Sequence, residues 1–211
     1  MENLSVKSFV EKLASNEPIP GGGSIAGLAA SLGSALSSMV FSLTVGKKIY
    51  RELSEDDKDK FDFCYSECRK YVDKFIKLMN DDANVFSEFI KVFSMPKETE
   101  EEKQKRNEAI EKGYEKAIKA PLETISECEK VYDLIAVAAE FGNKGVISDA
   151  AVSVIMLHAA VESSIINIKI NLSGIKDDKL KSEVLNKCQS VLKVGEIKKS
   201  RIMNMVEERL K

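Results

Sequence analysis

Apolar residues recur at helical spacing along almost the whole chain. Steps of three and four residues separate them, and no alternating run is long enough to predict a strand. The pattern predicts an all-α fold. Five expected helices run from about Leu4 to Ser15, from Ser24 to Gly46, from Asp56 to Ser94, from Ser148 to about Leu172, and from Asp177 to Leu210. A further helix, which contains Ala109, Ala117 and Ala120, is expected after the charged stretch from Lys97 to Asn107.

The segment from Ser24 to Gly46 carries no charged side chain. Leucine and methionine lie on one flank of the expected helix, and small residues such as Gly27 and Ala30 lie on another. A helix that is apolar or small on every side is typical of a buried position. We therefore expect residues 1–211 to form one domain, a bundle of long helices around this central, small-residue-rich helix.

Residues 25–45 are also about long enough to cross a bilayer. Six hydroxyl side chains dilute the apolarity of this stretch, and Lys47, Lys48 and Arg51 follow it on one side only. Basic residues on a single side and diluted apolarity favour a helix buried in protein. We expect no membrane association.

Two breaks are expected in the second half of the chain. Pro121 lies inside an alanine-rich helical pattern, where it removes a backbone donor and crowds the preceding turn, so it should kink or interrupt the helix. Gly142 to Gly145 then mark a connection. Ser148 and Asp149 are the expected cap of the helix that follows.

Composition narrows the class of protein. The chain has 32 lysine and arginine residues against 34 aspartate and glutamate residues, a near balance that gives no general attraction to nucleic acid or to anionic membranes. Four cysteines are too few for a disulfide scaffold in 211 residues, and no basic and apolar signal opens the chain. We expect a cytoplasmic protein that binds no nucleic acid.

The most informative short motif is Pro20-Gly21-Gly22-Gly23-Ser24. Glycine allows the backbone to approach a ligand closely, and Ser24 is a candidate cap for the central helix. The N-terminus of a helix favours anionic or carbonyl-bearing groups. A glycine turn that merely reverses the chain is the alternative, and the motif alone favours it.

The sequence gives little support for a metal site or for a nucleophilic catalytic residue. A di-iron bundle needs two Glu-x-x-His pairs, but His158 is the only histidine. Cys64 and Cys68 share a helix face, yet buried cysteines acting as small apolar residues are commoner than zinc ligands. We expect no metal site and no cofactor, and we interpret His158 as a histidine with its hydrogen bonds satisfied.

Polar residues within otherwise apolar helices are more suggestive. They are Asp81, Asp82, Asp149, Glu162, Asn167 and Asn171. Burying such groups costs several kcal/mol unless they are paired, so together they indicate either a structural hydrogen-bond network or a polar ligand cleft. Beside a glycine loop, a carboxylate whose pKa is shifted by burial could act as a general acid or base.

An ordered set of motifs resembles the cyclodeaminase family, which includes the C-terminal domain of formiminotransferase-cyclodeaminase and stand-alone methenyltetrahydrofolate cyclohydrolases. The resemblance covers the chain from about Val6 to Asp177. Its residues are the glycine loop, Leu43 to Lys48 with Tyr50, Asp82-Ala83 with Phe86, Pro96-Lys97, Arg106, Ala120 to Leu122, Gly142-Asn143, Ser148-Asp149, and Asn167 with Asn171-Leu172.

The resemblance implies an all-helical homodimer that binds tetrahydrofolate in a cleft near the glycine loop. Carried over by position, Gly21, Gly22, Gly23 and Ser24 contact the ligand, and Asp82 is the catalytic acid or base. The remaining candidates for substrate binding are Asn143, Asp149, Asn167 and Asn171, with Lys47 and Arg106 for the glutamate carboxylates; solvated surface charge is the alternative for the last two.

The implied reaction closes 5-formimidoyltetrahydrofolate to 5,10-methenyltetrahydrofolate and releases ammonia. The transferase domain of the fused enzyme is not among these motifs, and a separate formiminotransferase is a further candidate partner. Two alternatives stay open: methenyltetrahydrofolate cyclohydrolase, which forms 10-formyltetrahydrofolate, and a non-catalytic folate-binding helical module.

Overall fold

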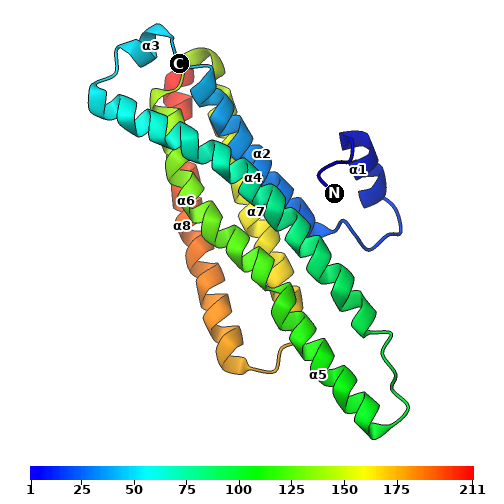
Figure 1. Ribbon diagram of the computed structural model, residues 1–211. Coiled ribbons are helices and arrows are strands. Elements are labelled where there is room, and N and C mark those ends of the chain that lie inside the picture. Colours follow the sequence, from blue (N-terminus) through cyan, green and yellow to red (C-terminus); the bar gives the residue numbers. More distant parts are fainter.

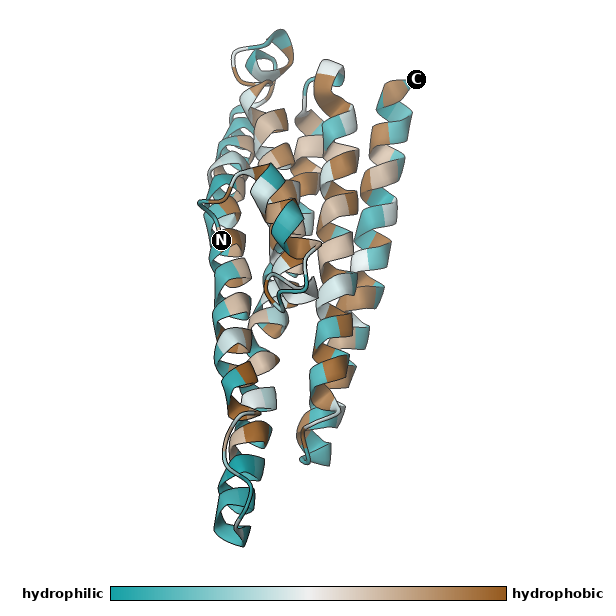
Figure 2. Cartoon of the chain, turned by 90° about the vertical axis from the view of Figure 1, so that its right-hand side faces the viewer, coloured by the Kyte–Doolittle hydropathy of each residue, from teal (hydrophilic) through white to brown (hydrophobic).

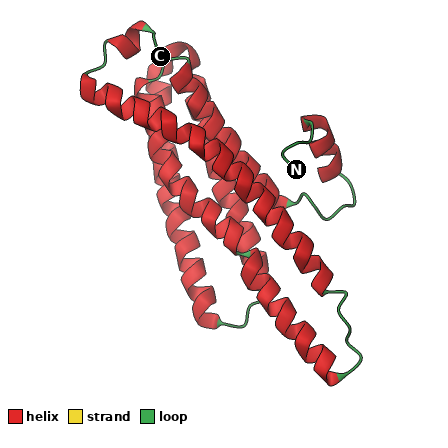
Figure 3. Cartoon of the chain, viewed as in Figure 1, coloured by secondary structure: helices red, strands yellow, loops and turns green.

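A computed structural model describes residues 1–211, and every regular element in it is helical (Figure 3). Long helices lie roughly parallel and antiparallel in an elongated bundle (Figure 1). The helices are α1 Val6–Leu13, α2 Gly22–Ser42, α3 Lys48–Arg51, α4 Glu55–Val92, α5 Glu100–Ala117, α6 Lys119–Phe141, the 3-10 turn η1 Lys144–Val146, α7 Ile147–Leu172 and α8 Asp178–Leu210. The predicted all-α fold is confirmed.

The uncharged helix α2 lies at the centre of the bundle, as predicted, and packs along α4, α6 and α7. Glycines permit this close packing. A Cβ added at Gly27 would lie 2.9 Å from the backbone of Met79 on α4, and one added at Gly33 would lie 2.9 Å from the carbonyl oxygen of Ser153 on α7. Two buried hydroxyls on α2 donate to backbone carbonyls, Ser31 to Val72 and Ser34 to Ala30, each at 3.0 Å, so hydrogen bonds compensate for the burial of these groups.

Close packing at Gly27 leads to a stability prediction. Alanine is normally favoured over glycine inside a helix by about 1 kcal/mol. Gly27→Ala is nevertheless expected to lower the free energy of unfolding by about 1–3 kcal/mol, because the new methyl group would push α2 away from α4. Urea unfolding measures the change. Ser38 is partly exposed on the same helix, and Ser38→Ala should change the free energy of unfolding by less than about 0.5 kcal/mol. Equal effects of the two substitutions would contradict the packing explanation.

Several predicted boundaries need correction. The central helix ends at Ser42 rather than Gly46, because the chain turns through Leu43 to a Gly46 with φ of 76°. Ser148 and Asp149 do not cap α7. The turn η1 precedes that helix, and Asn143 caps the turn by accepting from Gly145 N at 3.1 Å.

The break at Pro121 is confirmed. The chain divides into α5 and α6 at Ile118, and Pro121 lies in the first turn of α6, where a helix needs no donor from its backbone nitrogen. The start of α8 is also as predicted, since Asp177 accepts hydrogen bonds from two backbone N–H groups of its first turn.

Helix α1 stands apart from the bundle (Figure 1). Ser5 caps it by accepting from Ser8 N at 3.1 Å. Phe9 is buried, but Val6 is 83% exposed and Val10 is 54% exposed. The apolar stripe of α1 is therefore only partly covered within one chain.

Two helical segments, Gly22–Ser42 and Lys144–Leu172, are long and apolar enough to pass a membrane-span test of length and composition. Buried residues make up 61% and 50% of the two windows that pass. Core helices of a protein bundle pass the same test, and brown, apolar segments of adjacent helices face one another in Figure 2.

Candidate functional site

A cavity of about 480 Å³ lies beneath the N-terminus of α2. The loop before α2, the first turn of α2, α4, α5 and the C-terminal part of α7 all line it. Such a volume is typical of small-molecule sites. Asp82 is the only charged residue among the lining side chains, so electrostatic chemistry in this cavity centres on one carboxyl group.

The glycine loop forms one end of the cavity. Gly21 is the N-cap and the helix begins at Gly22, so the expectation that Ser24 caps α2 is wrong. Ser24 lies in the first turn of the helix, fully buried, and its hydroxyl donates instead to Asp82 Oδ2 at 3.1 Å. The motif thus brings a buried hydroxyl to the carboxylate rather than to the helix end.

Gly23 is required by this arrangement. A Cβ at this position would overlap the carboxylate of Asp82, so only glycine leaves room for Asp82 against the first turn of α2. At Gly22 a Cβ would lie 3.2 Å from Asn167 Nδ2. At Gly21 it would meet only an ordinary contact, 3.7 Å from the carbonyl oxygen of Pro18. The three glycines therefore have different roles, and Gly23 has the strictest one.

Burial raises the pKa of Asp82 above its ordinary value, and the hydrogen bond from Ser24 opposes this shift. Burial acts because the apolar surroundings disfavour the charged form, whereas the Ser24 hydroxyl stabilises it. A carboxyl group held between these two influences can exchange a proton closer to neutral pH than an exposed aspartate. This is the property required of a general acid or base.

Asn167 and Asn171 lie one turn apart on α7, and both line the cavity. Their side-chain nitrogens donate at 2.8 Å to the carbonyl oxygens of Ser163 and Asn167, each one turn earlier on the same helix. These bonds hold both amides in place. No donor from the protein reaches the two amide oxygens, which leaves them free to accept hydrogen bonds from a ligand.

An aromatic wall, missed in the sequence, lines the other end of the cavity. It consists of Phe86, Phe89 and Phe93 on α4 and Tyr114 on α5. The ring centroids of Phe89 and Tyr114 are 4.7 Å apart at an interplanar angle of 73°. Asp82 precedes these phenylalanines at steps of four, three and four residues, a single face of α4, and this spacing could have revealed the wall.

Two further glycines fix the wall. A Cβ at Gly113 would overlap the ring of Phe89, and one at Gly174 would overlap the ring of Tyr114. The rings thus pack flat against bare backbone on α5 and on the connection to α8. Rigid aromatic surfaces of this kind suit the flat rings of a heteroaromatic ligand.

Lys47, Asn143 and Asp149 do not lie at this cavity. They lie at the far end of the bundle, separated from the glycine loop by the 21 residues of α2, or about 30 Å. There the backbone N–H of Asn143 donates to Thr44 Oγ1 at 2.8 Å, and its side chain caps η1, which gives it a structural role in this chain. Asp149 lies in the first turn of α7.

Arg106 lies on α5 outside the cavity lining. Its Nη2 donates at 3.4 Å to the carbonyl oxygen of Phe93, an aromatic-wall residue. Its Nε is buried without a hydrogen-bond partner. The predicted role of Arg106 in binding a carboxylate therefore stays a prediction, with one free donor to support it.

The other candidate groups are buried elsewhere. His158 is 2% exposed, and its Nδ1 lies 2.7 Å from the hydroxyl of Tyr132, as expected for a histidine with a satisfied hydrogen bond. All four cysteines are buried and free. Burial raises the pKa of Cys68 to about 12, so this thiol stays protonated at neutral pH. The chain contains no group of three or more histidine, cysteine or acidic side chains positioned to hold a metal ion.

Comparison with known proteins gives a consistent result. Residues 5–190 match the family model described as formiminotransferase-cyclodeaminase. The chain is 33% identical over 208 residues to a methenyltetrahydrofolate cyclohydrolase of Methylorubrum extorquens, with 99% of this chain and 98% of that protein covered. It is 28% identical over 202 residues to a formimidoyltransferase-cyclodeaminase of chicken, Gallus gallus, covering 96% of this chain but only 37% of the chicken protein.

The same similarity holds for the three-dimensional structure. The crystal structure of a formiminotetrahydrofolate cyclodeaminase from Thermotoga maritima superposes with a TM-score of 0.84 at 25% sequence identity. The match covers 100% of this chain and 99% of that one. The cavity beneath α2 therefore belongs to a helical arrangement that this relative shares over its whole length.

Proposed function

Because the chain belongs to the formiminotransferase-cyclodeaminase family, we propose that it is a folate one-carbon enzyme that closes 5-formimidoyltetrahydrofolate to 5,10-methenyltetrahydrofolate and releases ammonia. One observation carries this assignment. The carboxyl group of Asp82 lies against the glycine loop in a cavity with no other charged lining residue. Burial raises the pKa of this group, and the hydrogen bond from Ser24 opposes that shift.

The reaction needs alignment and proton transfer. N10 attacks the carbon of the protonated formimidoyl group. The bond between N10 and that carbon forms, the carbon–nitrogen double bond becomes single, and the tetrahedral carbon then carries N5, N10 and an NH2 group. Asp82 takes the proton released by N10 and returns it to the amino nitrogen. The carbon–nitrogen bond then breaks, ammonia leaves, and the bridging methenyl group remains.

The remaining lining residues supply the alignment. Holding N10 against the carbon makes ring closure effectively intramolecular. In the proposed complex, Asn167 and Asn171 accept hydrogen bonds from the pterin, and the aromatic wall packs against the substrate rings. These steps draw on no metal ion and no redox cofactor.

A second candidate reaction is the hydrolysis of 5,10-methenyltetrahydrofolate to 10-formyltetrahydrofolate. The full-length relative from Methylorubrum extorquens, which is named for this activity and is 33% identical, favours it. Water attacks the same carbon, and the bond to N5 breaks instead. Asp82 would act as the base toward water, so both reactions place the same demand on the same carboxyl group.

A direct assay separates the candidates. The purified protein is supplied with 5-formimidoyltetrahydrofolate and, separately, with 5,10-methenyltetrahydrofolate, while methenyl absorbance and ammonia release are followed. The cyclodeaminase proposal requires methenyl formation with one ammonia per turnover. Methenyl loss alone would assign the cyclohydrolase. Folate binding with no turnover of either substrate would identify a non-catalytic folate-binding module and refute both reactions.

Ser24→Ala provides a pH test of the site. The hydrogen bond from Ser24 lowers the pKa of Asp82, so its removal should raise that pKa further. Where the carboxylate is the active form, the acid limb of the kcat/KM profile should move to higher pH. The matched variant Ser31→Ala removes a hydroxyl bonded to Val72 elsewhere on α2 and should leave the limb in place. If the acid limb does not move in Ser24→Ala, the ionisation that sets this limb is not that of Asp82.

We also propose that the protein acts as a cytoplasmic homodimer and receives its substrate from a separate formiminotransferase. The chicken relative supports the second point, because its name joins a formimidoyltransferase activity to the cyclodeaminase activity. An exposed apolar surface along α2 and α7 supports the first. Sedimentation equilibrium measures the oligomeric state.

A further inference from the structure

Helices α2 and α7 share an exposed apolar face along their whole length. α2 contributes Leu32, Met39 and Leu43, and α7 contributes Val152, Ile155, Ile166 and Ile170. Ile166 and Ile170 are 66% and 65% exposed, and no charged residue occurs on α2. Glu162, exposed on α7 between Ile155 and Ile166, is the charged residue on this face. An apolar surface of this size on a helical bundle marks an interaction surface.

The α2–α7 face connects the two ends of the bundle. At one end Ile170 also lines the cavity. At the other end Leu43 is followed within four residues by Lys47. Near the middle, Gly33 packs against Ser153 and Leu157, beside the exposed Leu32 and Ile155. Each end therefore lies about 15 Å from this midpoint along α2.

The two ends have complementary charge. The cavity lining contains Asp82 and no lysine or arginine, although the folate substrate of the proposed function ends in carboxylates. The far end carries Lys47, Lys48 and Arg51 on and beside α3. Lys48 pairs with Glu52 at 3.5 Å, whereas Lys47 is exposed and forms no ion pair in its own chain.

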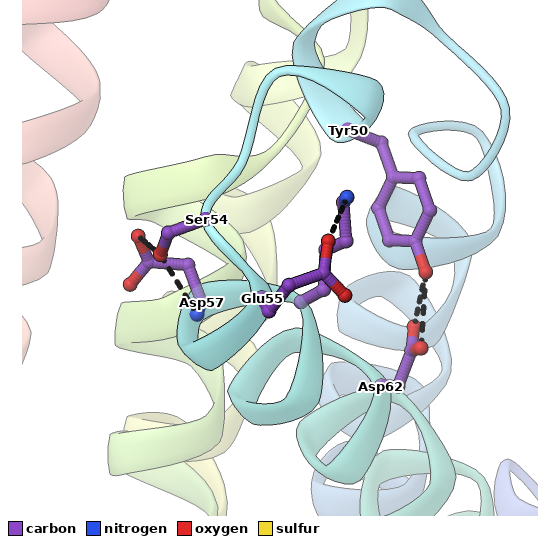
Figure 4. A network of polar contacts seen from close by, with 6 residues as sticks. Tyr50, Ser54, Glu55, Asp57 and Asp62 are labelled. Atoms are coloured by element: carbon purple, nitrogen blue, oxygen red, sulfur yellow. Dashed lines mark hydrogen bonds and ion pairs between the residues drawn. The ribbon is translucent and has the colours of Figure 1, made fainter.

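The segment that carries Lys47 is held in a fixed position. The hydroxyl of Tyr50 on α3 donates to both carboxylate oxygens of Asp62 on α4, each at 3.0 Å (Figure 4). Ser54 then caps α4 by accepting from Asp57 N at 3.2 Å (Figure 4). Lys47 is therefore presented by an anchored turn.

From this geometry we propose that a second copy of the chain packs antiparallel across the α2–α7 face and that its Lys47 completes the cavity. A two-fold axis near Leu32 and perpendicular to the helices brings the far end of each copy level with the cavity of the other. Lys47 of the second copy then binds a carboxylate of the substrate. A parallel pairing is disfavoured, because it would leave both cavities without a cation.

The position of α1 agrees with this arrangement. α1 stands away from the bundle on the side that faces the viewer in Figure 2, with Val6 and Val10 exposed. A second copy on that side would cover further apolar surface of α1.

Subunit mixing tests the proposal, which rests on the proposed function for its activity readout. Lys47→Glu is expected to lower kcat/KM at least about tenfold, because it removes a charge-assisted contact. Asp82→Asn supplies a second inactive parent. When the two variants are mixed and re-equilibrated, each heterodimer has one site with an intact Asp82 and an intact Lys47 from the other copy.

The expected result is recovery of about a quarter of wild-type activity per chain, since half of the dimers are mixed and each has one intact site. Activity no higher than the mean of the two parents would overturn the proposal, because Lys47 would then act within its own chain or not at all. Lys193→Glu, an exposed charge reversal on α8, is the control and should retain full activity.

A crosslinking experiment tests the arrangement without catalysis. Lys47→Cys and Ile170→Cys are made separately, and the native cysteines, all buried, should not react. A bismaleimide should join the two variants only when they are mixed. Crosslinking of Ile170→Cys to itself would show a parallel pairing and would overturn the proposal. A monomer that co-sediments with phosphatidylcholine–phosphatidylglycerol vesicles would show that this face binds a membrane, which would also overturn it. Inactive wild-type protein that still crosslinks as expected would refute the proposed reaction but not the antiparallel pairing.

Discussion

Asp82→Asn is expected to reduce kcat about 10³-fold while the protein stays folded. The amide has almost the same shape as the carboxyl group and can still accept the hydrogen bond from Ser24. It cannot carry a proton between N10 and the departing nitrogen. Turnover of both folate substrates is measured, with circular dichroism and thermal unfolding as the check on folding.

Asp81→Asn is the matched control. Asp81 precedes Asp82 on α4 and is partly exposed like it, but it does not line the cavity. Its substitution should leave kcat within about twofold of the wild type. Near-normal activity in Asp82→Asn, or an equal loss in both variants, would remove Asp82 from the proton transfer.

Gly23→Ala is expected to lower kcat/KM about 100-fold. The new methyl group would occupy the position of the Asp82 carboxylate, so the carboxylate must rotate away and lose its hydrogen bond to Ser24. A carboxyl group displaced by about 1 Å no longer reaches the reacting nitrogen in the correct orientation. Steady-state kinetics with both substrates measure the loss.

Gly21→Ala is the control for this substitution. It lies two residues away in the same loop, but a Cβ there would meet only the carbonyl oxygen of Pro18 at 3.7 Å. Activity should stay within about threefold of the wild type. Comparable losses at both positions would mean that the loop needs backbone flexibility rather than space for Asp82.

Hydrophobic spacing was sufficient to predict the fold. The long helices and the central place of α2 follow from where apolar and small residues recur, and Pro121 marks the division between α5 and α6. The exact caps did not follow. At Ser24 and Asp149 a residue type that often caps helices lies inside the first turn, whereas the N-cap of α2 is Gly21 and that of α7 is Val146.

The candidate site was predicted only in part, because sequence motifs do not show which end of a bundle they occupy. Asn167 and Asn171 reach the glycine loop because α7 runs antiparallel to α2, and the same arrangement carries Asn143 and Asp149 to the opposite end. Of the phenylalanines in the aromatic wall, the sequence motifs singled out only Phe86. Their spacing places them on one face of α4, but the presence of a cavity beside that face depends on how the start of α2, α5 and α7 pack around it.

The hairpin formed by α4 and α5 extends beyond the start of α2 (Figure 1) and supplies most of the aromatic wall. The large core cluster draws mainly on the other half of the bundle, through residues such as Phe41, Phe61 and Leu157. The three phenylalanines of the wall lie outside this cluster, although Tyr114 packs against it. Recognition of the ligand rings therefore draws mainly on side chains that are not part of the main core. Changes at the tip of this hairpin can therefore alter substrate preference at little thermodynamic risk, which makes it the natural place to engineer or to evolve a different specificity.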